Sequence, residues 1–370
     1  MSDKRPADIE ADVRRRRRRL GLTVRMAQDA VPGLTWAAVV DAEPVWSRAH
    51  GVSCVDRTEP MAADTVLQAC SLSKPVAALG MLSLVADGRV GLDQDVRPLL
   101  DYDVPRSRHY RGPDPDLTVR RLLTHRNGIA GRGTTPDKTG RFTKGGGGSV
   151  RFRGDTDRPI PSLEDFWAGY RGRAGVTITH PPDQQRSYSG LGYLVIEHLC
   201  EQLTRRPFAS WIDERILGPI GMSASSFVLE PELGLPLACG HDAHAGELPG
   251  GREVCPWSAA AGLYATAGDL ARFVACLVDR GRARDGVVVP ADTVERMVTQ
   301  GLGVTTTGRG ASLRFHHTGS NKGFRTILRG YPGRRAGVVV LSNSGGVAAG
   351  GTVAAVAAAA GRAHRWPGAR

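Results

Sequence analysis

Residues 69–85 read ACSLSKPVAALGMLSLV and contain the one Ser-x-x-Lys tetrad of the chain, Ser71 to Lys74. The apolar run after the tetrad stops at Asp87-Gly88, which predicts a buried helix that begins close to Ser71. Pro75 fits the first turn of this helix, where the amide that it lacks would have no partner. Residues three apart share a face of a helix, so we expect the Lys74 amine against the Ser71 hydroxyl.

This pair predicts a covalent catalytic centre. A serine hydroxyl is a weak nucleophile at neutral pH, and a neighbouring amine whose pKa is lowered by burial can accept its proton. The start of the helix also presents free backbone N–H groups to developing negative charge. The competing interpretation is that Ser71 only caps the helix and that Lys74 is a solvated side chain.

Two later segments favour catalysis. Residues 186–193 read RSYSGLGY and bring Tyr188 to the start of another apolar helix. Residues 317–324 read HTGSNKGF and follow a short strand pattern, which indicates a strand with close backbone approach at Gly319.

The order Ser-x-x-Lys, Tyr-Ser-x, His-Thr-Gly resembles the serine β-lactamase and penicillin-binding-protein-like hydrolase superfamily. The tyrosine of the second motif is similar to the branch that holds class C β-lactamases, D-amino-acid peptidases and β-lactamase-like carboxylesterases. Residues 118–128 and 261–273 add to the resemblance, which extends over residues 30–345.

Fold class follows from the strand patterns and from the resemblance together. Patterns near both ends of the chain predict strands that pair in one antiparallel sheet; they lie at residues 36–41, 44–54, 313–318, 324–330 and 336–341. A terminal helix from each end is expected to cover the sheet. The resemblance implies an α+β, β-lactamase/transpeptidase-like fold, with the active site between this sheet and a mostly helical domain.

The predicted organisation has three parts. They are a basic N-terminal extension at residues 1–22, a discontinuous sheet domain at 23–66 and 286–364, and a mostly helical domain at 67–285. Within the helical domain, the glycine-rich stretch 131–155 is expected to form a mobile loop that could act as a lid.

The resemblance also implies roles for individual residues. Ser71 would attack a carbonyl, while Lys74 and Tyr188 would share the general-base and general-acid work. A tyrosine titrates near pH 10 and needs a close cation to act as a base at neutral pH, and Lys74 would be that cation. The backbone N–H groups of Ser71 and Ser320 would form the oxyanion hole.

Further residues are expected to line the substrate site. They are His317, Thr318, Gly319, Ser189, Gly190 and Tyr264. His316 and His317 are neighbours on a predicted strand and must point to opposite faces, so only one of them can line the cleft, and the motif favours His317.

Two positions depart from the pattern of the family. Gly190 stands where an asparagine usually holds a substrate amide, and His317 stands where β-lactamases usually have lysine. An imidazole is a weaker anchor for a carboxylate than an ammonium group. We therefore expect turnover of a small ester, thioester or amide rather than strong β-lactam hydrolysis. An acyltransferase with the same Ser-Lys-Tyr site and a catalytically silent binding module remain alternatives.

Composition is that of a soluble enzyme. The formal net charge of the 370 residues is +12, and six consecutive arginines at 14–19 account for half of it. No nucleic-acid recognition motif accompanies them, so the expected partner is a small acyl substrate. Oligomeric state is not predicted.

The scattered cysteines predict no metal site, no disulfide framework and no cofactor. The arginine run is not followed by an apolar stretch of signal-peptide length, which predicts a cytoplasmic protein without a membrane span.

Overall fold

The computed structural model describes residues 21–129, 176–228, 236–252 and 258–368. The predicted extension at 1–22, apart from its last two residues, and the predicted loop at 131–155 lie outside these ranges. The expectations for them stay predictions.

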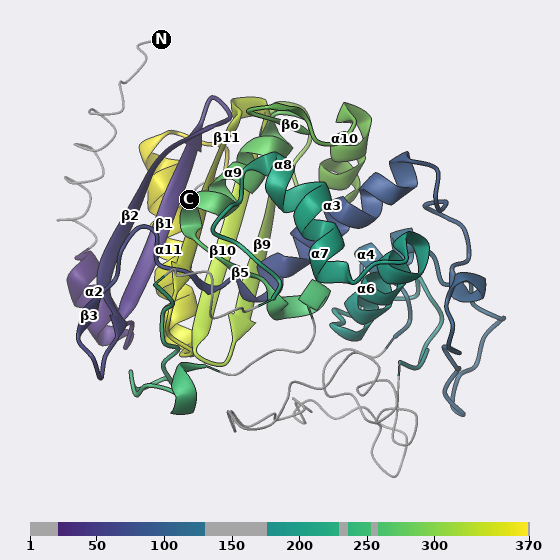
Figure 1. Ribbon diagram of the computed structural model, residues 1–370, viewed down its shortest axis with the longest axis horizontal. Coiled ribbons are helices and arrows are strands. Elements are labelled where there is room, and N and C mark those ends of the chain that lie inside the picture. Colours follow the sequence, from purple (N-terminus) through teal and green to yellow (C-terminus); the bar gives the residue numbers. More distant parts are fainter. Residues whose placement is uncertain (1–20, 130–175, 229–235, 253–257, 369–370) are drawn as a thin grey trace.

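A seven-stranded antiparallel sheet forms the left half of the molecule in Figure 1, with strand order β3-β2-β1-β11-β10-β9-β8. Its strands are β1 Gly33–Val40, β2 Glu43–Cys54, β3 Glu59–Pro60, β8 Thr305–Thr307, β9 Arg314–Asn321, β10 Phe324–Tyr331 and β11 Ala336–Ser342. Leu34 of β1 pairs with Ser342 of β11, so strands from opposite ends of the chain lie side by side at the centre of the sheet. This confirms the predicted pairing and fold class.

β11 shows why the central strands are apolar throughout. All seven of its residues are buried, and β-branched side chains suit a strand that is covered on both faces. Val338 and Val340 join the core under α2 (Leu22–Gln28) and α11 (Val347–Ala363), while Val339 and Leu341 join the core under α9 (Ala267–Val278). The terminal helices therefore cover one face of the sheet, as predicted.

Helices fill the right half of Figure 1 and pack on the face of the sheet that carries α9. They are α3 Ser73–Ala86, α4 Val119–Leu123, α6 Leu191–Thr204, α7 Phe208–Ile212, α8 Gly218–Ile220 and α10 Ala291–Gln300. α3 ends at Ala86, just before the predicted Asp87-Gly88 stop, and almost all of its side chains are buried. Its first two residues, Ser73 and Lys74, complete the Ser-x-x-Lys tetrad that begins in the preceding turn.

Short elements connect these parts. Strand pairs are β4 Leu67–Gln68 with β5 Tyr264–Ala265, and β6 Arg282–Ala283 with β7 Gly286–Val287. Short helical turns are η1 Cys70–Leu72, η2 Arg97–Leu99, η3 Asp213–Leu217, η5 Pro249–Gly251, η6 Ser258–Gly262, η7 Gly310–Ser312 and η8 Pro332–Arg334. Of these, η3 and η6 are π-helical. Among the residues described, no helix is both long enough and apolar enough to cross a lipid bilayer.

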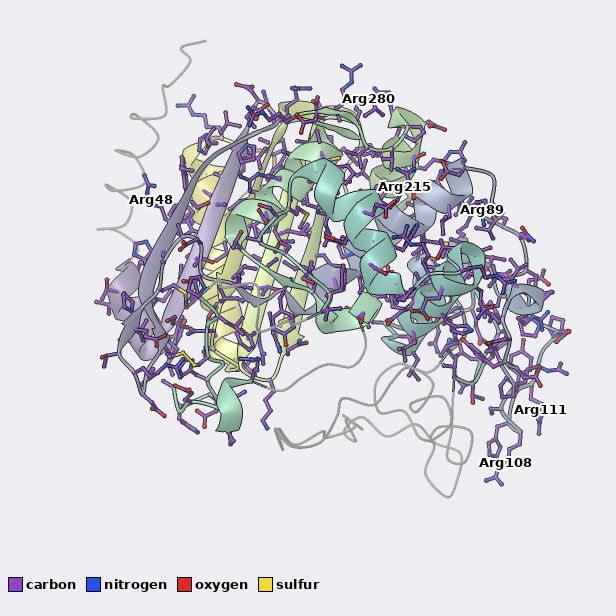
Figure 2. All side chains as sticks on the ribbon, in the orientation of Figure 1. Arg48, Arg89, Arg108, Arg111, Arg215 and Arg280 are labelled. Atoms are coloured by element: carbon purple, nitrogen blue, oxygen red, sulfur yellow. A yellow bond between two sulfur atoms is a disulfide. The ribbon has the colours of Figure 1, made fainter. Side chains whose placement is uncertain are left out.

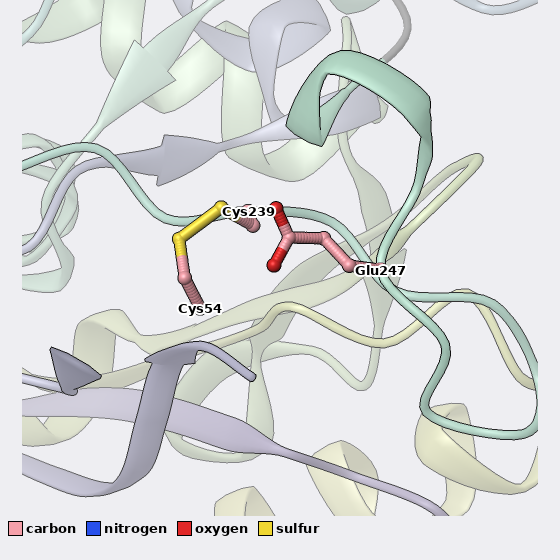
Figure 3. A group of neighbouring side chains, drawn as sticks. All are labelled: Cys54, Cys239 and Glu247. Atoms are coloured by element: carbon pink, nitrogen blue, oxygen red, sulfur yellow. A yellow bond between two sulfur atoms is a disulfide. The ribbon is translucent and has the colours of Figure 1, made fainter. Parts of the chain in front are cut away.

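A disulfide joins Cys54, at the end of β2, to Cys239, so the prediction of no disulfide was wrong. The two residues are 185 apart in sequence, and nothing local in the chain signals that they meet. Figure 3 shows the bonded sulfurs beside the Glu247 carboxylate. These three groups are not a metal-ligand set in this state, because a ligating cysteine must be a free thiolate and the Arg57 guanidinium already lies 2.6 Å from the Cys54 sulfur.

Breaking this bond is expected to destabilise the fold. A cross-link across so long a loop restricts the unfolded chain, and disulfides of this kind typically contribute about 2 to 4 kcal/mol. The double variant Cys54→Ser, Cys239→Ser should therefore unfold several degrees below the wild type in a thermal melt. A reductant should lower the unfolding temperature of the wild type and of a Cys276→Ala control, but not that of the double variant. Equal melting of wild type with and without reductant would contradict the assignment.

Candidate active site

Ser71 lies in the short turn η1, between β4 and α3, with 8% of its surface exposed. The residue before it, Cys70, has a left-handed backbone with a φ of 55°. Such a conformation costs a non-glycine residue on the order of 1 to 3 kcal/mol and is one of the strained states that cluster at active sites. The turn brings the Ser71 hydroxyl to the start of α3.

Lys74 contacts Ser71 as the spacing predicts. Its Nζ donates a hydrogen bond to Ser71 Oγ at 3.2 Å and another to the backbone oxygen of Ala260, in η6, at 2.5 Å. Only 2% of Lys74 is exposed, so the interpretation of Lys74 as a solvated side chain was wrong. The buried amine is held beside the hydroxyl.

Tyr188 lies beside Lys74, in the segment that leads into α6. Lys74 Nζ lies 5.0 Å from the centre of the Tyr188 ring and 5.4 Å from that of Tyr193, on α6 itself. Such distances allow cation–π attraction to both rings. Tyr193 is fully buried, whereas 39% of Tyr188 is exposed. Tyr188 is thus the aromatic side chain here that a substrate could also touch.

His125 is a site residue that the sequence interpretation missed. Its ring lies 4.4 Å from that of Tyr188, and its Nδ1 accepts a hydrogen bond from the backbone N–H of Ser189 at 3.2 Å. Burial, and then the charge of Lys74, keep the pKa of His125 well below its usual value. An uncharged imidazole has a free nitrogen to accept that bond, so His125 fixes the backbone next to Tyr188.

The third motif forms β9, which runs beside the Ser71 turn. His317 and Gly319 face the helices, while His316 and Thr318 lie on the opposite face, as their pairing with β10 requires. The His317 ring lies 6.1 Å from the Tyr188 ring, which confirms that only one of the two histidines faces the motif residues. Burial, followed by the charge of Lys74, lowers the pKa of His317 to about 3. His317 is therefore uncharged at neutral pH.

Gly319 lets β9 pass directly against the Ser71 turn. A Cβ at this position would lie 2.1 Å from Thr326 Oγ1, 2.7 Å from Cys70 Cβ and 2.8 Å from the backbone oxygen of Ala69. Real Cβ atoms do not approach so closely, so β9 or the turn would have to move. The close approach predicted at this glycine is confirmed.

Replacing Gly319 by alanine should therefore damage the site. A displacement of about 1 Å between reacting groups costs roughly a hundredfold in rate. We expect kcat/KM for an ester substrate to fall by about this factor in Gly319→Ala. Gly350→Ala, in α11, has no atom closer than 4.0 Å to the new methyl group and should keep wild-type kinetics. Wild-type kinetics in Gly319→Ala would show that β9 does not set the geometry at Ser71.

The other residues that were predicted to line the substrate site differ in burial and in hydrogen bonding. Ser189 is buried and its Oγ accepts a hydrogen bond from the N–H of Gly192, at the start of α6. Tyr264 is 4% exposed, and its hydroxyl accepts a hydrogen bond from Gln68. Gly190 directly precedes α6, beside Tyr188. Ser320 directly follows Gly319, near the C-terminal end of β9, and is exposed. Their roles in substrate binding, and that of Thr318, stay predictions.

Glu197 is a second residue that the sequence did not reveal. It lies inside the protein on α6, and an oxygen of its carboxyl group accepts a hydrogen bond from the N–H of Ala259 at 2.9 Å. Burial raises the pKa of Glu197 to about 8. The next residue of η6, Ala260, supplies the oxygen that binds Lys74. Glu197 therefore supports the turn that orients the amine.

Comparison with known proteins identifies the family of this chain. Residues 22–362 match the family model described as Beta-lactamase. The chain is 32% identical over 193 residues to esterase EstB of Burkholderia gladioli, a match that spans 51% of this chain and 46% of the esterase. It is 29% identical over 345 residues to penicillin-binding protein 4 of Amycolatopsis lactamdurans, covering 85% of this chain and 81% of that protein.

A solved structure shares the fold. The octameric penicillin-binding protein homologue from Pyrococcus abyssi superposes with a TM-score of 0.70 at 24% identity, over 88% of this chain and 72% of that one. On the match over residues 22–362, the chain belongs to the beta-lactamase family.

Proposed function

We propose that this protein is a serine hydrolase that acts on a small ester, thioester or amide through an acyl-enzyme on Ser71. The observation that carries the proposal is the 3.2 Å hydrogen bond between the buried Lys74 amine and the Ser71 hydroxyl. Membership of the beta-lactamase family and the relatives named as an esterase and a penicillin-binding protein support hydrolase chemistry of this kind.

In the acylation step, Ser71 Oγ attacks the substrate carbonyl carbon and its proton passes to the Lys74 and Tyr188 pair. Negative charge gathers on the carbonyl oxygen, and the backbone N–H groups of Ser71 and Ser320 are proposed to bind it. Such donors contribute on the order of 3 kcal/mol each to the transition state. The leaving alcohol, thiol or amine takes the proton from the pair as the tetrahedral intermediate collapses.

Deacylation repeats these steps with water as the nucleophile. The Lys74 and Tyr188 pair takes a proton from water, the hydroxyl attacks the acyl carbon, and Ser71 Oγ leaves with a proton returned by the pair. Tyr188 suits this work because it is close to the cation and still partly exposed. An acyltransferase would differ only in the acceptor that replaces water.

The departures at Gly190 and His317 favour esters over β-lactams. Glycine has no side-chain amide to hold the acylamino group of a substrate. The uncharged His317 cannot form an ion pair with a carboxylate. The test is product analysis on a panel of p-nitrophenyl esters, D-amino-acid amides and a chromogenic cephalosporin, with and without added alcohols or amines. Ester hydrolysis well above cephalosporin hydrolysis supports the proposal. Products that form only with an acceptor would indicate acyl transfer, and no turnover of any substrate would favour the silent binding module.

Compartment is a separate question. The cytoplasmic expectation stays a prediction, and the Cys54–Cys239 bond weighs against it because disulfides are rare in reducing compartments. Apart from the run at residues 14–19, arginines are spread over the molecule: Figure 2 labels Arg48, Arg89, Arg111 and Arg280 at separate places on its outside. This distribution of the described arginines supports the expectation that the partner is a small molecule rather than a nucleic acid.

A further inference from the structure

A polar pocket of about 650 Å³ lies where the C-terminal end of α10 meets β8. Three arginines, Arg126, Arg186 and Arg309, line it together with several threonines. Among the described residues that form its wall there is no aspartate or glutamate. The pocket is therefore rich in hydrogen-bond donors of positive charge.

The three charges are not neutralised within the described part of the chain. Arg120 and Arg121, on α4, form ion pairs with Asp93 and Asp183 at 2.6 and 2.8 Å. By contrast, Arg126 donates to the backbone oxygen of Asp183, and no ion pair joins Arg186 or Arg309 to a described carboxylate. Like charges around one hollow create a positive potential that favours a bound anion, and guanidinium groups bind carboxylates especially well.

The pocket adjoins the proposed catalytic residues. Arg186 is two residues before Tyr188, and Arg126 directly follows His125, whose ring contacts that of Tyr188. On the sheet side, Thr306 of the pocket wall pairs with Phe315, which shares a face of β9 with His317. The charge of Arg186 is also among the causes that lower the pKa of His317, after burial and Lys74. A substrate held at Ser71 could thus extend into the pocket.

The arginines of this pocket also supply a positive charge that the third motif lacks. His317 is uncharged at neutral pH and cannot attract a carboxylate, whereas arginine stays charged at any physiological pH. We propose that the pocket of Arg126, Arg186 and Arg309 binds a carboxylate that the substrate carries away from its scissile bond. The proposal rests on the proposed function and narrows its substrate class to anionic acyl compounds, such as half-esters of dicarboxylic acids.

The test compares charged with neutral esters. Mono-p-nitrophenyl glutarate, with its free carboxylate, is set against neutral p-nitrophenyl valerate; a second pair places the carboxylate on the leaving group, as 4-butyryloxybenzoate against phenyl butyrate. In Arg186→Gln, Arg309→Gln, we expect KM for the charged member of one pair to rise about tenfold, the loss typical of one or two charge-assisted hydrogen bonds. The neutral member should change by no more than about twofold. The pair that responds identifies the end of the substrate that enters the pocket.

Arg48→Gln is the matched control. Arg48 lies on β2, close to the opposite edge of the sheet from β8, and is labelled at the left of Figure 2. Arg48→Gln removes one positive charge far from the pocket, where the double variant removes two, and should alter KM for neither member of a pair. Equal changes for charged and neutral esters in the double arginine variant, or no change for either charged ester, would overturn the proposal.

Failure of the proposed function can be told apart from failure of this inference. If the wild type turns over no ester at all, glutarate binding is measured directly by calorimetry on wild type and on the double variant. Binding that the double variant loses supports the pocket even then. Binding that is equal in both proteins, or absent from both, contradicts it.

Discussion

Ser71→Ala is expected to abolish ester hydrolysis, with kcat at least a thousandfold below that of the wild type. Removing the nucleophile of a serine hydrolase leaves only the contribution of substrate binding and of the oxyanion hole. Ser71 Oγ accepts a hydrogen bond from Lys74, so the change removes the hydroxyl that the amine is placed to activate. Initial rates with a p-nitrophenyl ester measure the effect, and a thermal melt checks that the fold persists.

Two controls separate this result from general damage at the start of α3. Ser83→Ala removes a hydroxyl that donates to the backbone oxygen of Gly80 on the same helix, and it should keep the wild-type rate. Cys70→Ala removes the neighbouring thiol, which is fully buried, and this variant should also keep the wild-type rate. A Ser71→Ala protein with more than about a tenth of wild-type activity would mean that another group is the nucleophile.

Lys74→Met should have the second largest effect. Methionine fills a similar volume but has no amine to accept the Ser71 proton, and loss of a general base typically costs about a hundred- to ten-thousandfold. We expect kcat/KM for a neutral ester to fall within that range. Thermal stability should be retained or increased, because the change replaces a buried amine, 2% exposed, by an apolar side chain of similar size. Kinetics and a melt on the same preparation give both quantities.

Lys322→Met supplies the charge control. It removes a lysine from the turn between β9 and β10 and should leave hydrolysis of the neutral ester unchanged. If Lys74→Met lost stability and activity together, the simpler explanation would be a structural role for Lys74. Activity close to wild type in a stable Lys74→Met protein would exclude it as the base.

Local geometry made part of the site predictable. The contact between Ser71 and Lys74 depends only on helical spacing, and the end of α3 on the Asp87-Gly88 stop. Strand alternation likewise separated His316 from His317. Each of these features is fixed within a few residues of sequence, where backbone periodicity decides which side chains share a face.

Contacts between segments that are far apart in the chain could not be predicted from the sequence. His125 meets Tyr188, and Glu197 supports the turn that holds Lys74, only because the helices pack in one particular way. The bond between Cys54 and Cys239 spans 185 residues and has no spacing signal. Tyr264 was predicted to line the substrate site as an aromatic residue, and in the structure its hydroxyl accepts a hydrogen bond from the buried Gln68. Tertiary packing, which no local pattern encodes, decided all four.

The most direct measurement is the mass of the protein itself during turnover. A brief reaction with a p-nitrophenyl ester, quenched in acid, should give a species heavier than the free protein by one acyl group. Peptide mapping should locate that group on Ser71. An unmodified protein that nevertheless hydrolyses the ester, or an acyl group on Cys70 or on any residue other than Ser71, would contradict the account.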